Sequence, residues 1–208
     1  MSLTFTYAYF LDNAEWKPAD SQLRANAYDV TRITPVIGNL TLDLPSRILR
    51  IESTRRLTHA DQLPSPLFCG ATQHLQYTDQ AQRHELLKQG VAEQVPSPQT
   101  VTVIIPIRKS QAWWDLAQDQ RVAFYQKSAD RIGHTAIGLP YVSHIFRRLY
   151  HCRYLESAGA FDFITYFEFQ DEHTDEFLHL LQSLRDVNQN PEWAYVEAEI
   201  EIWAKKIS

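Results

Sequence analysis

The C-terminal half of the chain alternates between the periodicities of strands and helices. Apolar residues recur with the period of a strand in four stretches and with the spacing of a helix in two others. The strand-like stretches are 101–107, 145–155, 161–169 and 196–202, and the helical ones are 112–134 and 174–187. The order β-α-β-β-α-β predicts a ferredoxin-like α+β unit, in which a four-stranded antiparallel sheet carries two helices on one face.

The two faces of this predicted sheet need different kinds of cover. The run 101–107 is rich in Val and Ile and reads as buried on both faces. In the last strand Glu197, Glu199 and Glu201 alternate with apolar residues, so we expect one dry and one solvent-facing side there. A second sheet, from the N-terminal half or from another subunit, would cover the face opposite the helices.

The first hundred residues give weaker local signals. Strand-like runs cover 3–10 and 28–37, and the second ends at a Pro/Gly stop. The proline-bearing stretch 40–67 favours loops and short edge strands. A helix is predicted over 78–89, with Thr78 as its cap, Asp79 at its positive end and Gly90 at its end. A length of 208 residues allows one large domain or two fused small ones.

Composition narrows the class of protein. A net charge of −5 argues against nucleic acid as a partner, because nucleic-acid-binding proteins usually carry a basic excess. Cys69 and Cys152 have no C-x-x-C partner and read as reduced thiols. No stretch has the pattern of a signal peptide or of a membrane span, so we expect a cytoplasmic protein. The aromatic share of 12% could fill a core or wall a flat apolar cofactor.

The common catalytic motifs are absent from the sequence. It contains no P-loop, dinucleotide glycine pattern, H-E-x-x-H or G-x-S-x-G. The eight histidines show no paired spacing with a third ligand, which argues against a metal site built from several protein ligands. A site with one histidine, in which a macrocycle supplies the other ligands of the metal, stays open.

Four stretches together carry a family resemblance: IPIRKSQAWW within 104–114, HTAIGLPYVSHIFRRLYHCRYL (134–155), DFITYFEF (162–169) and PEWAYVEAEIEI (191–202). With them the chain resembles the chlorite dismutase family of haem proteins, more its short branch without a signal peptide than its longer exported branch. In the N-terminal half only GATQHLQYT (70–78) adds to the likeness. The resemblance implies a dimeric α+β barrel type of fold, with a degenerate ferredoxin-like unit over 1–100 and a haem-binding unit over 101–208.

The resemblance also implies the residues that hold the haem. A histidine at the end of the first helix ligates the iron, and an arginine thirteen positions later lies over the opposite face, which here selects His134 and Arg147. Glu192, just before Trp193, corresponds to the family's glutamate that orients the ligating imidazole. The plainer alternatives are a hydrogen-bonded histidine near a helix end, a solvated loop carboxylate and a strand arginine paired with a surface carboxylate, as we expect for the adjacent Arg148.

Further residues are implied at the haem edge. Lys109, Trp113 and Trp114 are expected to line it, and Lys109 is expected to donate to the haem propionates, with Trp113 and Tyr77 as additional candidates. The plainer alternatives are a solvated lysine at a strand end and a tryptophan pair in the core.

The implied function is a haem b-dependent oxidoreductase that converts chlorite to chloride and dioxygen. Arg147, permanently charged and planar, would hold the small oxyanion above the iron. One alternative is a haem-binding or haem-handling protein without chlorite turnover. A weak peroxidase is another, disfavoured because no distal His or Asp is evident. The last is an α+β barrel protein whose sheet only mediates assembly. We expect a homodimer, with no nucleic-acid partner and no membrane association.

Overall fold

The computed structural model describes residues 5–12, 16–17, 23–39, 42, 44–58, 61–72, 79–128, 132–155 and 160–207. Its strands are β1 (Tyr7–Leu11), β2 (Arg24–Ile37), β3 (Arg47–Ser53), β4 (Phe68–Thr72), β5 (Thr100–Lys109), β6 (Phe146–His151), β7 (Phe163–Gln170) and β8 (Val196–Lys206). Its α-helices are α1 (Gln80–Gln89), α2 (Gln111–Asp115), α3 (Gln118–Tyr125), α4 (His134–Gly138) and α5 (Thr174–Arg185). Short 3₁₀ turns are η2 (Leu139–Tyr141), η3 (Asp171–His173) and η4 (Pro191–Tyr195).

The strands close into one antiparallel barrel in the order β1-β3-β2-β8-β5-β7-β6-β4. The segment β8-β5-β7-β6 has the ferredoxin-like order 4-1-3-2 when its strands are numbered along the chain. The segment β4-β1-β3-β2 has the same order. The predicted fold class is therefore confirmed as two fused ferredoxin-like sheets. The division at residues 1–100 and 101–208 stays a prediction.

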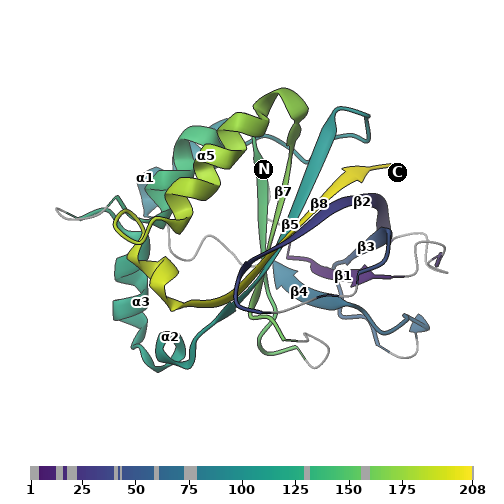
Figure 1. Cartoon of the computed structure of the whole chain (residues 1–208), viewed down its shortest axis with the longest axis horizontal. Coiled ribbons are helices and arrows are strands. Elements are labelled where there is room, and N and C mark those ends of the chain that lie inside the picture. Colours follow the sequence, from purple (N-terminus) through teal and green to yellow (C-terminus); the bar gives the residue numbers. More distant parts are fainter. Residues whose placement is uncertain are drawn as a thin grey trace.

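The N-terminal half of the same chain covers the face of the C-terminal sheet opposite the helices (Figure 1). Two strand pairs join the halves: β2 with β8, through pairs such as Ile33 with Ile202, and β4 with β6. Apolar side chains from every strand, among them Phe10, Tyr28 and Ile104, fill the barrel interior. Of the two sources of cover left open by the sequence, the structure uses the first.

Helix α5 covers the outer face of the C-terminal sheet. Phe177, Leu180, Leu181 and Leu184 are buried on one side of it and pack against β5, β7 and β8. Acidic residues occupy its first turn, as its positive N-terminal end favours. The predicted helix 174–187 is thus confirmed, two residues shorter at its end.

The single helix expected over 112–134 is wrong. The backbone is extended at Leu116 and again at Gln126, which ends α2 and α3. Gly133 then adopts φ +83°, and a Cβ at that position would lie 2.7 Å from the carbonyl of Gln126, so the close turn requires glycine. His134 consequently begins a new helix, α4, and does not end a long one.

The solvent-facing side expected for the last strand is also wrong in part. Glu197 is exposed and pairs with Arg108 at 3.3 Å, as expected. Glu199 and Glu201 are buried beneath α5, where Arg185 from that helix pairs with both. A cation supplied by another element therefore allows this acidic face to pack inside.

The N-terminal elements differ from the predictions in two places and agree with them in a third. Strand β3 lies between β1 and β2, where we expected loops and short edge strands. Asp79, not Thr78, caps α1 by accepting from the backbone of Gln82 at 2.8 Å, and Thr78 lies outside the described residues. The end of β2 agrees with its Pro/Gly stop, because Gly38 has φ +76°.

The barrel interior also contains a network of charged side chains. Arg50 and Lys206 pair with Glu93, and Lys206 also pairs with Glu168 at 2.9 Å. Arg148 of β6 points into the barrel and pairs at 2.5 Å with Glu52, which is itself buried. The surface partner expected for Arg148 is therefore wrong. Within the described ranges, no helix is long and apolar enough to cross a membrane.

Candidate functional site

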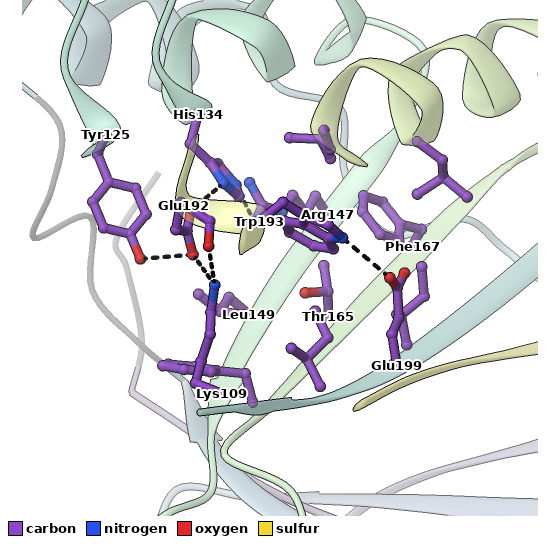
Figure 2. A pocket seen from close by; sticks show the side chains of 15 residues that line it. Lys109, Tyr125, His134, Arg147, Leu149, Thr165, Phe167, Glu192, Trp193 and Glu199 are labelled. Atoms are coloured by element: carbon purple, nitrogen blue, oxygen red, sulfur yellow. Dashed lines mark hydrogen bonds and ion pairs between the residues drawn. The ribbon is translucent and has the colours of Figure 1, made fainter. Parts of the chain in front are cut away.

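A cavity lies between the outer face of the C-terminal sheet and the helices that cover it (Figure 2). Its space, counted together with the part that is open to solvent, amounts to about 560 Å³. Its walls are mainly aliphatic and aromatic side chains, and a few polar groups converge on it. Its polar and charged lining residues include Lys109, His134, Arg147, Thr165, Glu192 and Glu199.

His134 and Glu192 form a buried hydrogen-bonded pair at this cavity. The Nδ1 atom of His134 lies 2.8 Å from Oε2 of Glu192, and the exposed fractions of the two residues are 7% and 3%. Burial lowers the pKa of His134, although Glu192 opposes the shift. Burial alone would raise the pKa of Glu192, but Lys109 and His134 outweigh it and hold that pKa far below its usual range. The pair is therefore a neutral imidazole beside a carboxylate.

Arg147 determines which nitrogen of His134 carries the proton. Its Nη2 atom lies 3.0 Å from Nε2 of His134. A guanidinium can only donate, so Nε2 accepts, and the proton sits on Nδ1, which donates to Glu192. The His134 ring and the guanidinium of Arg147 thus meet at the same cavity (Figure 2), with the acceptor nitrogen Nε2 turned towards Arg147.

Lys109 forms a buried ion pair with Glu192. Its Nζ atom donates to Oε1 of Glu192 at 2.6 Å and to the backbone carbonyl of the same residue at 3.2 Å. The ammonium group also lies 4.7 Å from the centre of the Trp113 ring and 5.3 Å from that of Trp193. Lys109 is buried, so the solvated lysine considered from the sequence does not occur. Its contact with propionates stays a prediction.

The two neighbouring tryptophans occupy different positions. Trp113 is buried and packs against Phe124 and Tyr195. Trp114 stacks on Phe163, a cavity-lining residue, at 5.9 Å between ring centres. Both lie next to the cavity without belonging to its lining. Tyr77 lies outside the described residues.

The sequence reasoning missed three polar residues of the cavity. Tyr125 of α3 places its hydroxyl 3.4 Å from Oε1 of Glu192. Thr165 lies opposite Leu149 in the pairing of β6 with β7, on the face that carries Arg147. Strand alternation could have indicated Thr165 once Arg147 was chosen, but Tyr125 is placed by helix packing that no local pattern shows.

Glu199 is the third missed residue. It is fully buried, and burial raises the pKa of its carboxyl group despite the nearby Arg185. Arg185 donates to Oε1 at 3.0 Å, and the indole of Trp193 donates to Oε2 at 3.3 Å. A second buried carboxylate therefore borders the cavity, on the side away from His134 (Figure 2).

Comparisons with known proteins place this architecture. A search against protein-family models finds no match. The chain is 36% identical over 87 residues to a chlorite dismutase of Ideonella dechloratans, and the match covers 42% of this chain and 27% of that protein, about a quarter of its length. The dimeric chlorite dismutase structure from Nitrobacter winogradskyi is 30% identical, with a TM-score of 0.69 and coverage of 96% of this chain and 99% of that one.

A more distant structure shows the same fold. A mutant chlorite dismutase of Candidatus Nitrospira defluvii in complex with cyanide is 20% identical, with a TM-score of 0.65, and covers 98% of this chain and 90% of that chain. Fold and site together define an α+β barrel protein with a histidine-bearing pocket outside its sheet. The chain belongs to the chlorite dismutase family.

Proposed function

We propose that the chain is a haem b enzyme that converts chlorite to chloride and dioxygen, with His134 as the iron ligand. One observation carries the proposal: a neutral imidazole, fixed by a buried carboxylate, points Nε2 into a cavity that also holds a guanidinium, which donates to Nε2 at 3.0 Å and would turn away when an ion binds there. That tautomer is the one an iron ion requires from histidine. Membership of the family supports the substrate.

The residues present fit a haem. The donor set offers one imidazole nitrogen, as a site needs when a macrocycle supplies the other ligands. Ile105, Ile107, Leu149, Phe163 and Phe167 give the cavity the apolar walls that a flat aromatic ring needs. When bound, the haem iron would supply the redox chemistry that breaks Cl–O bonds and joins two oxygen atoms.

Glu192 and Lys109 prepare His134 for this role. By accepting the hydrogen bond from the Nδ1–H group of His134, Glu192 fixes the orientation of the ring and raises the basicity of Nε2. Lys109 keeps Glu192 ionised in a buried position, and so maintains that hydrogen bond. We propose that Trp113, Trp114 and Tyr77 add to the edge of the same site.

Arg147 is the residue that we propose to hold the anion. Within the described residues it makes no ion pair with a carboxylate, whereas the other cation of the lining, Lys109, is bound to Glu192. Burial lowers the pKa of Arg147, but a guanidinium remains protonated in proteins. A fixed positive charge in an apolar cavity attracts a small oxyanion and keeps a charged fragment from escaping.

We also propose a cytoplasmic homodimer. The dimeric description of the Nitrobacter winogradskyi structure supports the assembly. Cys152 is a buried free thiol, which suits a reducing compartment.

The test is oxygen release from chlorite by the purified, haem-loaded chain. We expect dioxygen and chloride in equal amounts, with strongly reduced release in R147A at unchanged haem content. H134A should lose stoichiometric haem loading, seen as loss of the Soret band. A parent protein with bound haem and intact Arg147 that releases no oxygen would contradict the proposal.

A peroxidase is the second candidate, because Glu199 supplies a buried carboxylate at the cavity where the sequence offered none. Peroxide chemistry needs a group that carries a proton near the substrate. Faster turnover of hydrogen peroxide than of chlorite, with peroxide turnover lowered in E199Q, would favour this candidate. Stable haem binding with neither activity would leave a haem-handling protein.

A further inference from the structure

A second group of metal-binding side chains lies away from the cavity, at the start of α5. His144 belongs to the turn before β6, His173 ends η3, and Glu176 lies in the first turn of α5. One ligand atom from each of the three residues lies within 4.8 Å of those of the other two. We propose that this His144–His173–Glu176 triad binds one divalent transition-metal ion, of the zinc type, with water completing the coordination.

The spacing of the donor atoms suits a single ion. Nδ1 of His144 lies 3.0 Å from Oε2 of Glu176, and Nδ1 of His173 lies 3.4 Å from Oε1. Ligands at the usual zinc distances in a tetrahedron are separated by about 3.4 Å. Both rings turn Nδ1 towards the carboxylate, and they lie parallel, 4.5 Å apart between centres. Because an ion lies close to the plane of each imidazole that binds it, the two rings must rotate out of this stack for both Nδ1 atoms to reach one ion.

Binding requires a shift of protons but no redox step. Each imidazole binds the ion through the free pair of Nδ1 and keeps its proton on Nε2. For His173, Oε1 of Glu172 lies 3.6 Å from Nε2, beyond hydrogen-bond distance but near enough to attract that proton electrostatically.

The surrounding charge favours a cation, and the donor types select the kind. Four carboxylates, those of Asp171, Glu172, Asp175 and Glu176, lie in the six-residue segment 171–176, which also contains His173. They concentrate divalent cations near the triad. Imidazole nitrogens suit zinc, copper and nickel ions, whereas magnesium and calcium take oxygen ligands.

The triad joins two elements that border the cavity. His144 lies three residues before Arg147, and α5 carries Leu181 and Leu184 of the cavity wall. The histidines show no paired spacing with a third ligand, which argued against a multi-ligand site, but His144 and Glu176 are 32 positions apart and only the fold brings them together. The site uses none of the residues proposed to hold haem, so it stands or falls independently of that function.

The test is calorimetric titration of the metal-stripped full chain with zinc chloride. We expect one zinc per chain, at least tenfold weaker binding in H144Q, H173Q and E176Q, and unchanged binding in H179Q, which removes another exposed histidine of α5. Magnesium chloride should give no binding heat. Zinc should also raise the melting temperature of the parent chain and not that of H144Q.

The location is checked separately by anomalous scattering from zinc-soaked crystals, with the peak expected between His144, His173 and Glu176. H134Q, which removes the buried histidine of the cavity, should retain the zinc affinity of the parent. Equal zinc affinity in the parent, H144Q and H173Q would overturn the proposal, as would loss of binding in H134Q alone or the absence of binding to the parent.

Discussion

Replacement of Glu192 by glutamine tests the buried charge arrangement beside His134. The carboxylate accepts from Lys109 at 2.6 Å, from His134 at 2.8 Å and from the Tyr125 hydroxyl at 3.4 Å. The amide oxygen of glutamine can keep one of the two short bonds, but its nitrogen cannot accept the other. E192Q therefore leaves the Lys109 ammonium buried without a counter-charge.

The magnitude follows from that geometry. Removal of one partner of a buried ion pair costs about 3–5 kcal/mol. The hydrogen bond that glutamine retains reduces this cost, so we expect E192Q to lower the free energy of unfolding by about 3 kcal/mol, the lower end of that range. Most proteins have only about 5–15 kcal/mol of stability, so the loss is large.

Urea unfolding of the chain without added haem measures this loss free of any contribution from cofactor binding. E197Q is the matched control, because Glu197 is exposed on β8 and forms a surface pair with Arg108, worth about 0–1 kcal/mol. The double variant K109M/E192Q removes both charges and should lose less than the sum of the single variants. A loss in E192Q no greater than that in E197Q would refute the reasoning.

Three further predictions concern the fold. G133A should lower the melting temperature, because residue 133 has φ +83° and a Cβ there would meet the carbonyl of Gln126. G138A is the control and should be neutral or stabilising, because nothing lies within 4 Å of a Cβ at that position. Equal melting temperatures of the two variants would contradict this reasoning. Burial opposes the effect of Arg50 and Arg148 on Glu52, whose pKa still falls below its usual value. Its stabilisation is therefore present above about pH 4.5 and lost as pH falls through the lowered pKa, so E52Q should flatten the acid limb of a stability–pH curve; an unchanged limb would count against the pair. Burial raises the pKa of the Cys152 thiol, so a thiol reagent at pH 8 should react with it only after unfolding; rapid labelling of the native chain would disprove its burial.

Local patterns predicted the C-terminal sheet well. The β-branched run in β5, the alternation in β7 and the apolar stripe of α5 each depend on neighbours within one element, which the sequence displays directly. The sequence did not predict strand β3 because Arg50 and Glu52 turn charged side chains into the barrel, where Glu93 and Arg148, distant in the sequence, pair with them. A polar residue in a strand looks solvent-facing until its partner from another element is known.

In the site, too, the sequence indicated individual residues but not the contacts that distant elements make with them. His134, Arg147, Lys109 and Glu192 were selected by resemblance, and the structure brings all four to one cavity. The prediction that His134 ends a long helix was nevertheless wrong, because the turn at Gly133 ends the preceding segment and a new helix, α4, begins at His134. Glu199 was read as solvent-facing, since Arg185, the cation that lets it enter the interior, belongs to α5.

The seam between β2 and β8 has a consequence for synthesis on the ribosome. Thr31 of β2 and Trp203 of β8 are hydrogen-bonded across 172 positions of sequence. The first four strands can pair with each other early, but β2 keeps an open edge until β8 has been made. Because contacts of such long range form slowly and open strand edges invite pairing with other chains, the nascent N-terminal half must pass through a period in which its edge is available to chaperones or to misassembly.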